Sequence, residues 1–432
     1  MFWAPSHNKN APAHFTAINP LAPPTAMHIA WLGKKSPFCG NVTYSREITN
    51  ALLDRGHQVS FFHFEQEAAD PDSFFPSWLA GQGQPRKPPQ AVETSGWTLA
   101  CEVPLPCLYK STIYTVPTLR SSKVLAESLA RLKPDLVHAS LTLSPLDFLL
   151  PEICDELDLP LVATFHPAFE RKPRTLTSST QQLTYQLYAP FLANYDRTIV
   201  FSQMQRELLV KLGVPESQVA VIPNGVDALK YSPGPSSLKE QLGRERIFVY
   251  QGRIALEKNV EALLKAWKKS DMGPDCQLVI VGNGPLAASL MPFYGEEHGI
   301  TWLGFIGDEH RRIEILRGAD VFILPSLMEG LSLSLLEGMA CGLAPLATDA
   351  GADGEVLEGG AGVVLRTEGV TGQLRNLLPV FRDQPEFCAL LGQKARQRVL
   401  ERYTLSGNVT QLEKLYEEVM RLHRRSWLKW RV

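Results

Sequence analysis

The second half of this chain is built around the stretch Pro325-Ser-Leu-Met-Glu-Gly-Leu-Ser-Leu-Ser-Leu-Leu-Glu-Gly-Met-Ala-Cys-Gly-Leu-Ala-Pro345. It follows Ala319–Leu324, an apolar run rich in β-branched and aromatic residues that is typical of a buried strand. Gly330 and Ser332 then open a leucine-rich helix, and Gly342 ends it, because glycine is common just past a helix end. The stretch therefore predicts a strand, a loop and a helix in succession.

Two glutamates in this stretch are candidates for ligand binding. Glu329 lies at the helix entrance, and Glu337 lies inside the helix about two turns further on, among leucines and a methionine. A carboxylate in such an apolar setting is costly to bury without a partner. A strand end, a loop, an acid and a helix N-terminus together suit a polyhydroxylated, phosphorylated ligand. The alternative is an ordinary crossover whose glutamate faces solvent.

Length and composition limit the classes of protein that the chain can belong to. Its 432 residues are too many for a single hydrophobic core and predict two or three domains. A hydrophobic fraction of 44% with 20% charged residues is typical of a globular protein, and a net charge of −2 argues against nucleic acid as a partner. The seven cysteines are scattered, which indicates a reducing compartment and neither a disulfide scaffold nor a zinc site.

The first 26 residues differ from the rest of the chain. They are rich in Pro, Ala and Asn, show no periodicity, and lack the basic start and apolar core of a secretory signal. We expect residues 1–26 to be a disordered arm or the product of a misassigned start codon. Met27 directly precedes the first predicted strand, which favours the second option. The chain has no run of about 18 apolar residues, so we expect no membrane-spanning segment.

Strands and helices alternate twice along the chain. The first half has predicted strands at Met27–Gly33, Gly56–Phe62, Pro134–Ala139, Leu159–Phe165 and Thr198–Phe201, helices near Val42–Arg55 and Ser121–Leu132, and a long variable loop over 66–98. After a polar linker at 228–246, the second half has predicted strands at Ile247–Gly252, Cys276–Gly282 and Thr301–Gly304, and a helix at Asn259–Trp267. This pattern predicts two doubly wound, Rossmann-like α/β domains that face each other across a cleft, with the ligand at the carboxyl ends of the strands. We place the domains at 27–232 and 233–410.

A second set of candidates follows the strand that ends at Gly252. Arg253 and Lys258 come between this strand and the next helix, so both can point at the cleft beside the N–H groups of the glycine turn. Two cations and a helix N-terminus suit a diphosphate without a metal. No D-x-D pair stands at a strand end, and Asp349 and Asp353 lie in a glycine-rich loop, so we expect no metal. The alternative is a pair of surface cations beside Glu257.

The first half contributes weaker candidates. His166 stands at a strand end, where open α/β sheets present functional groups, although a lone histidine is more often structural. His138 follows a buried strand and is a weaker candidate still. Gly40 and Asn41 open a helix and could let the backbone approach a phosphate, but one glycine is a weak signal.

Taken together, these motifs resemble the retaining GT-B glycosyltransferases of family 4. The resemblance rests on Glu329 with Glu337, on Arg253 with Lys258, and on Ile222-Pro-Asn-Gly-Val-Asp227. Gly282-Asn-Gly-Pro285 and the Gly351–Glu355 loop fit as well. It runs from about Met27 to Tyr416, and the second half of the chain carries most of its specificity.

The resemblance implies roles for these residues. Glu337 would bind the ribose hydroxyls of a nucleotide, and Arg253 and Lys258, with Gly252, would bind its diphosphate. Glu329 and the N–H groups of Gly330, Leu331 and Ser332 would hold the donor sugar, and His166 would reach that sugar from the opposite domain. The leaving diphosphate would take the acceptor's proton on the same face, so that the anomeric configuration is retained, with no cofactor and no metal. Family members often have two glycines where this chain has Cys39-Gly40-Asn41, so the approach of this loop to the donor phosphate is open.

The C-terminal tail bears on the acceptor. Its last twelve residues, Arg421–Val432, hold five cations, no acid and two tryptophans; Arg424, Arg425, Trp427, Lys429 and Trp430 are candidates for membrane contact. Tryptophan favours a membrane interface, and basic residues favour anionic head groups. The basic stretch Arg171, Lys172 and Arg174 is a possible second contact. The alternative is that residues 411–432 form a helix that crosses back over the cleft, as in related folds, with a solvated basic end.

The acceptor is the most open part of the prediction. The segments Trp31–Tyr44 and Thr164–Ala168 also resemble cyanobacterial digalactosyldiacylglycerol synthases. That resemblance implies transfer of galactose from UDP-galactose to monogalactosyldiacylglycerol by a cytoplasmic protein that is peripheral on a thylakoid or plasma membrane. A family 4 enzyme with a soluble, polysaccharide or sugar-phosphate acceptor is the main alternative. A GT-B epimerase or phosphorylase should lack this Glu/Arg/Lys set, and a paralogue that only binds should have lost part of it.

Overall fold

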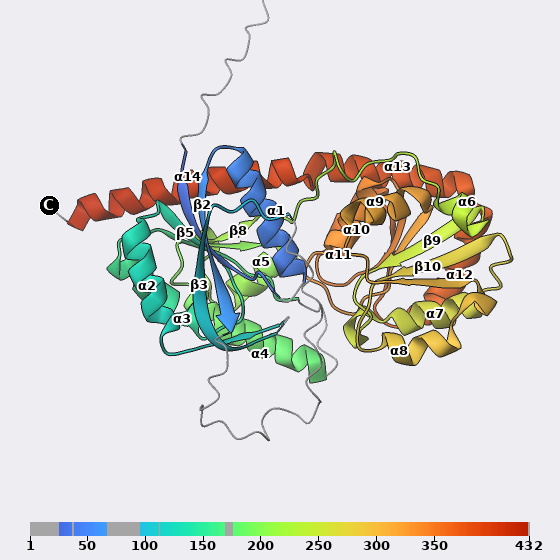
Figure 1. Ribbon diagram of the computed structural model, residues 1–432, viewed down its shortest axis with the longest axis horizontal. Helices are drawn as coiled ribbons and strands as arrows, with labels where there is room; N and C mark the ends of the chain where they lie inside the picture. The colour runs from blue at the N-terminus through green and yellow to red at the C-terminus, as the bar shows by residue number, and fades with distance from the viewer. Residues whose placement is uncertain (1–25, 37–38, 67–95, 112, 169–175, 431–432) are drawn as a thin grey trace, which may run out of the picture.

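The computed structural model describes residues 26–36, 39–66, 96–111, 113–168 and 176–430; for 176–180 and 425–430 it describes the backbone only. The described chain forms two α/β domains side by side, with α13 (Pro385–Arg402) along the second domain and α14 (Leu405–Trp430) along the first (Figure 1). Two doubly wound domains were predicted from the alternation of strands and helices, and this prediction is confirmed.

The first domain is a sheet with helices on both faces. Within the described residues the sheet has eight strands in the order β4-β3-β2-β1-β5-β6-β7-β8, and only β4 runs antiparallel to its neighbour. The strands are β1 (His28–Gly33), β2 (Gln58–Gln66), β3 (Cys101–Lys110), β4 (Thr115–Pro117), β5 (Leu136–Ser140), β6 (Leu161–Thr164), β7 (Arg197–Val200) and β8 (Val219–Val221). The helices are α1 (Gly40–Asp54), α2 (Ser121–Leu132), α3 (Leu146–Glu156), α4 (Leu176–Leu192) and α5 (Gln203–Lys211).

The second domain repeats this architecture with a parallel sheet. Its described strands lie in the order β11-β10-β9-β12-β13-β14. They are β9 (Arg246–Gln251), β10 (Cys276–Val281), β11 (Ile300–Gly304), β12 (Val321–Leu324), β13 (Ala344–Thr348) and β14 (Val363–Leu365). Its helices are α6 (Leu238–Leu242), α7 (Val260–Lys268), α8 (Ala287–Leu290), α9 (Glu309–Gly318), α10 (Leu333–Ala340), α11 (Asp353–Val356), α12 (Val370–Asp383) and α13 (Pro385–Arg402). The polar linker predicted at 228–246 contains α6.

The strand–loop–helix stretch quoted above forms as its sequence predicts. All four residues of β12 are buried, because this apolar strand lies inside the sheet between β9 and β13. Ser332 is the N-cap of α10, and its Oγ accepts a hydrogen bond from the N–H of Leu335 at 3.3 Å. Gly342 has a φ of +85° just past the helix end, a conformation that glycine adopts at little cost.

Two segments cross between the domains next to each other. Val226 donates its N–H to Tyr403 O at 2.8 Å, and Leu405 donates its N–H to Val226 O at 2.9 Å. A side chain at Gly225 would lie 2.7 Å from the backbone of Leu405, so only glycine fits there. The motif Ile222–Asp227 therefore holds the two crossing segments together.

Helix α14 (Leu405–Trp430) starts at this crossing and runs back along the first domain (Figure 1). Glu413 accepts from Arg55 at 2.6 Å and from His57 at 3.0 Å, so its carboxylate joins α14 to the end of α1. Further along, the Tyr416 hydroxyl lies 2.5 Å from His138 Nδ1 on β5. His138 is fully buried here, so the structure assigns it to packing between α14 and the sheet.

Candidate functional site

The strand order of each sheet reverses at one point, and the predicted site residues follow the strands at these points. In the first sheet the reversal lies between β1 and β5, which precede Asn41 and Leu141; in the second it lies between β9 and β12. Arg253 and Lys258 follow β9, and Glu329 follows β12. Crevices at such switch points are where doubly wound proteins bind ligands. The topology thus gathers residues that are far apart in the sequence.

Glu329 and Lys258 form an ion pair at the switch point of the second domain. Lys258 Nζ lies 2.6 Å from Glu329 Oε1, and the Ser326 hydroxyl donates to the same oxygen at 2.7 Å. Glu329 is only 7% exposed, so its carboxylate depends on these two partners. Lys258 was predicted to bind the diphosphate and Glu329 the sugar, and the structure brings both to one place.

The glycine-rich loop at 351–354 packs closely against the backbone of Glu329 and Gly330. Gly351 has a φ of +59°, and a side chain there would lie 2.1 Å from Glu329 O. Ala352 N–H donates to Gly330 O at 2.7 Å, and the buried Asp353 accepts the N–H of Ser332 at 2.9 Å. This last contact departs from the prediction that Ser332 N–H faces a ligand, because that N–H already has a partner inside the protein.

Glu337 lies on α10 with polar partners from β9 and α9. Gln251 Nε2, at the end of β9, donates to Glu337 Oε2 at 2.6 Å. Burial raises the pKa of Glu337 to about 7, although the positive charge of Arg312 and the Gln251 hydrogen bond oppose the rise. A carboxylate buried among apolar residues needs polar or charged partners, and Gln251 and Arg312 provide them for Glu337.

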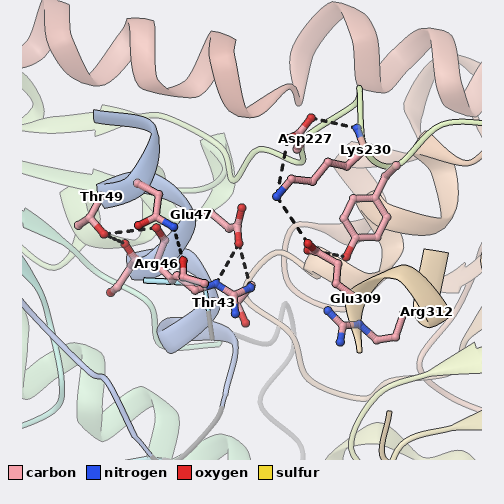
Figure 2. A network of polar contacts seen from close by, with 12 residues as sticks. Thr43, Arg46, Glu47, Thr49, Asp227, Lys230, Glu309 and Arg312 are labelled. Atoms are coloured by element: carbon pink, nitrogen blue, oxygen red, sulfur yellow. Dashed lines mark hydrogen bonds and ion pairs between the residues drawn. The ribbon is translucent and has the colours of Figure 1, made fainter. Parts of the chain in front are cut away.

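Glu309, whose charge acts on this glutamate, belongs to an ion-pair network. Figure 2 shows Lys230 between Asp227 and Glu309, with Arg312 nearby; Lys230 Nζ lies 3.5 Å from Glu309 Oε2. The hydroxyl of Tyr231 donates to Glu309 Oε1 at 3.4 Å. Figure 2 also shows Arg46 and Glu47 of α1 on the opposite side of the domain boundary. Charged side chains of both domains thus lie on the two sides of the domain boundary.

Arg253 is less constrained than Lys258. Its guanidinium pairs with Glu257 one turn later, and the side chain is 46% exposed. This contact agrees with the alternative of a surface cation beside Glu257, although the residue stands at the switch point as predicted. Gly252 before it has a structural use, because a side chain there would lie 2.8 Å from the Tyr250 hydroxyl.

The first domain brings His166 to the same boundary. A side chain at Gly330 would lie 3.2 Å from His166 O, so the two predicted sugar-binding segments of opposite domains touch. His166 Nε2 lies 2.8 Å from Ser140 Oγ, and Ser140 donates to Asn41 Oδ1 at 2.8 Å. Gly40 is exposed with open space around it. The approach of the Gly40–Asn41 backbone to a donor phosphate stays a prediction, and the side chain of Asn41 contacts Ser140 and Leu141.

Most residues predicted to contact a membrane lie outside the part of the chain that the structure describes. Arg171, Lys172 and Arg174 fall outside the described residues, as do the side chains of Arg425, Trp427, Lys429 and Trp430. Arg424 is exposed near the end of α14. In the described part of the chain no helix is long and apolar enough to cross a membrane. Within the same residues no three His, Cys, Asp or Glu side chains cluster as metal ligands would.

Comparison with known proteins identifies the family of this chain. A model described as "Glycosyltransferase Family 4" matches residues 39–228, and one described as "Glycosyl transferases group 1" matches residues 237–398. The two matches cover the two domains in turn. The chain belongs to the family 4 (group 1) glycosyltransferases.

Curated relatives of this family 4 chain have several names. N-acetyl-alpha-D-glucosaminyl L-malate synthase of Bacillus anthracis is 27% identical over 212 residues, 48% of this chain and 55% of the relative. UDP-Gal:alpha-D-GlcNAc-diphosphoundecaprenol alpha-1,3-galactosyltransferase of Escherichia coli is 28% identical over 71% of this chain and 81% of the relative. GDP-mannose-dependent alpha-(1-6)-phosphatidylinositol dimannoside mannosyltransferase of Mycobacterium tuberculosis is 27% identical over 46% of this chain and 53% of the relative. The chain thus spans about half the length of two of these three.

Solved structures support the fold of this family 4 chain. HepE of Anabaena, solved in complex with UDP, has a TM-score of 0.69 at 17% identity and covers 91% of this chain and 100% of its own. Sucrose-phosphate synthase of Thermosynechococcus elongatus has a TM-score of 0.67 at 21% identity, with 92% and 100% covered. The GT-B arrangement that the sequence motifs predicted is therefore confirmed.

Some residues of the site were missed by the sequence analysis. Gln251 stood in the quoted strand but received no role, and Ser140 and Arg312 were not singled out. Arg312 lies on α9 in the ordinary amphipathic context Glu309-His-Arg-Arg-Ile313, which carries no local signal of a ligand. Ser140 carries a signal only by its place at the end of a buried strand.

Proposed function

We propose that this chain is a retaining glycosyltransferase that moves a hexose from a nucleotide sugar to a lipid acceptor. One observation supports the proposed transfer: Lys258 pairs with the buried Glu329 of the second domain beside Gly330, which touches His166 of the first. Charge for a leaving phosphate, a carboxylate for sugar hydroxyls and a residue from the opposite domain therefore meet at one boundary.

In this proposal the chain works by positioning and by charge stabilisation. The acceptor hydroxyl oxygen bonds to the anomeric carbon as the bond from that carbon to the diphosphate oxygen breaks. The departing diphosphate takes the hydroxyl proton on the same face, so the configuration is retained. Arg253 and Lys258 stabilise the negative charge that develops on the diphosphate, and preorganised charges of this kind often supply the largest part of catalysis. Each cation contacts a carboxylate, Glu257 or Glu329, and would turn toward the bound diphosphate.

The donor and acceptor are inferred at a finer level. UDP-galactose is the donor and monogalactosyldiacylglycerol the acceptor, which gives digalactosyldiacylglycerol, at a membrane surface where the protein is peripheral. Support comes from the resemblance of Trp31–Tyr44 and Thr164–Ala168 to such synthases, and from the cations and tryptophans of Arg421–Val432. By their names, the Escherichia coli and Mycobacterium tuberculosis relatives use acceptors linked to diphosphoundecaprenol and to phosphatidylinositol.

The test is transfer from a panel of radiolabelled nucleotide sugars to a membrane lipid extract, with the products separated into lipid and aqueous fractions. We expect label from UDP-galactose in a galactolipid with one more hexose, and equal activity with and without EDTA. Glu329→Gln keeps the size of the side chain but removes its charge. Its transfer activity is compared with that of the wild type, and we expect it to be lower because the carboxylate holds the donor sugar.

Each other outcome contradicts a defined part of the proposal. Label found only in a water-soluble product would replace the lipid acceptor by a soluble, polysaccharide or sugar-phosphate acceptor. Activity that requires added Mn²⁺ or Mg²⁺ would show that Arg253 and Lys258 do not suffice for the diphosphate. Transfer from none of the nucleotide sugars would overturn the proposal as a whole.

A further inference from the structure

A row of hydrogen bonds leads from the backbone of the first domain to His166. Asn41 Nδ2, on the first turn of α1, donates to Leu141 O at 3.2 Å. Ser140 Oγ, at the end of β5, donates to Asn41 Oδ1 at 2.8 Å. The same Ser140 oxygen lies 2.8 Å from His166 Nε2. Ser140 is fully buried, so its hydroxyl forms its hydrogen bonds with these protein groups and not with water.

The chemistry of each group determines the direction of every bond in this row. The carbonyl of Leu141 can only accept, so the amide of Asn41 turns its NH₂ group toward it and its oxygen toward Ser140. The amide oxygen can only accept, so the single hydroxyl hydrogen of Ser140 points at Asn41. Ser140 therefore has only lone pairs left for His166, and Nε2 of the histidine must carry the hydrogen.

The surroundings of the ring keep it neutral and in place. Burial, and to a smaller extent the positive charge of Lys34, lowers the pKa of His166 to about 3. A neutral imidazole has one N–H, so a hydrogen on Nε2 leaves a lone pair on Nδ1. The ring of Tyr44 packs edge-on at 4.9 Å between centroids, and Phe201 packs at 5.3 Å, which restricts rotation of the imidazole.

We propose that Asn41 and Ser140 fix His166 as the Nε2–H tautomer, so that Nδ1 accepts a hydrogen bond from a hydroxyl group of the donor sugar. The identity of the ligand rests on the proposed function, whereas the tautomer does not. Asn41 and Ser140 are positioning residues, and His166 determines specificity for a free hydroxyl. A neutral acceptor repels phosphate oxygens, so His166 contacts the sugar and not the diphosphate.

The tautomer is tested by NMR on protein with ¹⁵N-labelled histidine, in which the two ring nitrogens have distinct shifts. The signal of His166 is assigned by its loss in His166→Gln. We expect Nε2–H from pH 5 to pH 8 in the wild type, without protonation in this range. A hydrogen on Nδ1, or a charged ring at pH 6, would overturn the proposal.

Variants of the row give a second readout. Asn41→Leu removes the acceptor for the Ser140 hydroxyl at similar side-chain size, so the hydroxyl can donate to Nε2 and the Nδ1–H form should appear. Ser45→Ala is the matched control, because the Ser45 hydroxyl only donates to the row, at a long 3.4 Å to Ser140 Oγ and 3.5 Å to Asn41 Oδ1, so its loss leaves Asn41 as the acceptor for Ser140. An unchanged tautomer in folded Asn41→Leu would contradict the proposal. If this variant fails to fold, Ser140→Ala takes its place, and a single Nε2–H form there would contradict it equally.

Activity with altered donors connects the tautomer to function. Asn41→Leu should lower kcat/KM for the natural donor about tenfold, the effect of one hydrogen bond, with UDP affinity unchanged. For the deoxy donor that lacks the hydroxyl read by His166, wild type and Asn41→Leu should perform alike. If Asn41→Leu loses the same factor in kcat/KM relative to wild type with every deoxy donor, His166 does not bind one particular hydroxyl. If no nucleotide sugar is turned over at all, the proposed function fails, whereas the NMR result still decides the tautomer.

Discussion

If Glu337 binds the ribose as proposed, its raised pKa makes nucleotide binding depend on pH. Its pKa lies near 7 because burial disfavours the charged form more than Arg312 and Gln251 favour it. Below pH 7 the group is mostly a neutral acid, and above pH 7 it is mostly a carboxylate. Hydrogen bonds from ribose hydroxyls to a carboxylate are stronger than those to a neutral acid.

We therefore expect the affinity for UDP-glucose to rise about fivefold between pH 6 and pH 8, with a midpoint near 7. UDP-glucose is the suitable probe because its diphosphate has no ionisation in this range, unlike that of free UDP. Glu337→Gln should bind more weakly at pH 8 and show no such dependence. Calorimetry on both proteins measures the effect, and parallel pH profiles would remove Glu337 from the nucleotide site.

The two cations after β9 differ in burial, and their substitution should reveal different costs. Lys258→Ala and Arg253→Ala should each lower kcat about 100-fold, the scale on which one preorganised charge stabiliser acts. Lys258→Ala should also lower the melting temperature, because it leaves the buried Glu329 without its cation. Arg253→Ala should not, since its side chain is half exposed.

Lys265→Ala is the control for these two variants. Lys265 lies on α7 in an exposed pair with Glu261 at 2.7 Å, so its loss removes a surface cation outside the site. Steady-state kinetics and thermal melts of the three variants separate the roles. Arg253→Ala and Lys258→Ala proteins with kcat close to that of Lys265→Ala would exclude a diphosphate clamp.

At the scale of elements, α14 is held to the first sheet by a buried polar chain. Tyr416 Oη lies 2.5 Å from His138 Nδ1, and His138 Nε2 lies 2.8 Å from Thr164 Oγ1 on β6. The imidazole stacks on Trp31 at 4.0 Å, and burial lowers the pKa of His138 to about 3. A neutral, fully bonded histidine thus links the last helix to two central strands.

Removing the Tyr416 hydroxyl should destabilise the protein and spare the nucleotide site. Tyr416→Phe leaves His138 Nδ1 buried without a partner, which costs about 1–3 kcal/mol of unfolding free energy. UDP affinity should not change, because Glu337, Lys258 and Arg253 lie in the other domain. Urea unfolding and calorimetry test both statements, with the exposed Tyr109→Phe as control. Equal stability of Tyr416→Phe and wild type would show that this hydrogen bond adds nothing net.

At the scale of the whole molecule, α14 is structural over most of its length. Ion pairs join Glu413 to Arg55 and Glu418 to Arg197 at 2.8 Å, and a hydrogen bond of 3.0 Å joins His423 to Asp158. This arrangement agrees with the alternative of a helix that packs back on the first domain. The proposed membrane contact is thereby limited to the residues after His423.

Deleting Ser426–Val432 tests this division of the helix. The deletion should release the protein from anionic vesicles and reduce transfer to lipid, because each basic residue near such a surface contributes about 1 kcal/mol. High salt should have the same effect on binding, since charges are screened beyond about 8–10 Å. The melting temperature and UDP affinity should stay nearly constant, because the polar contacts of α14 that the structure describes all lie at or before His423. A large drop in melting temperature would instead make the tail part of the packed helix.

Local pattern was sufficient for most elements but not for the edge of the first sheet. β12, α10, β9 and α2 lie within a residue or two of their predicted places, since apolar runs and glycine or serine boundaries signal them directly. β3 and β4 were not predicted. β3 contains Pro104 and Pro106, which argue against a strand paired on both sides, yet it pairs with both β2 and β4.

By itself the sequence determined that the chain forms two doubly wound domains, and which residue types stand after their strands. Only the tertiary structure decided which of these residues meet. Lys258 pairs with Glu329 across 71 residues, Gln251 with Glu337 across 86, and Ser140 with Asn41 across 99. These contacts depend on the order of strands in each sheet and on the packing of one domain against the other. Local periodicity in the sequence predicts neither the strand order nor the domain packing. Both depend on which apolar faces bury one another over long sequence distances, and these faces have similar residue patterns.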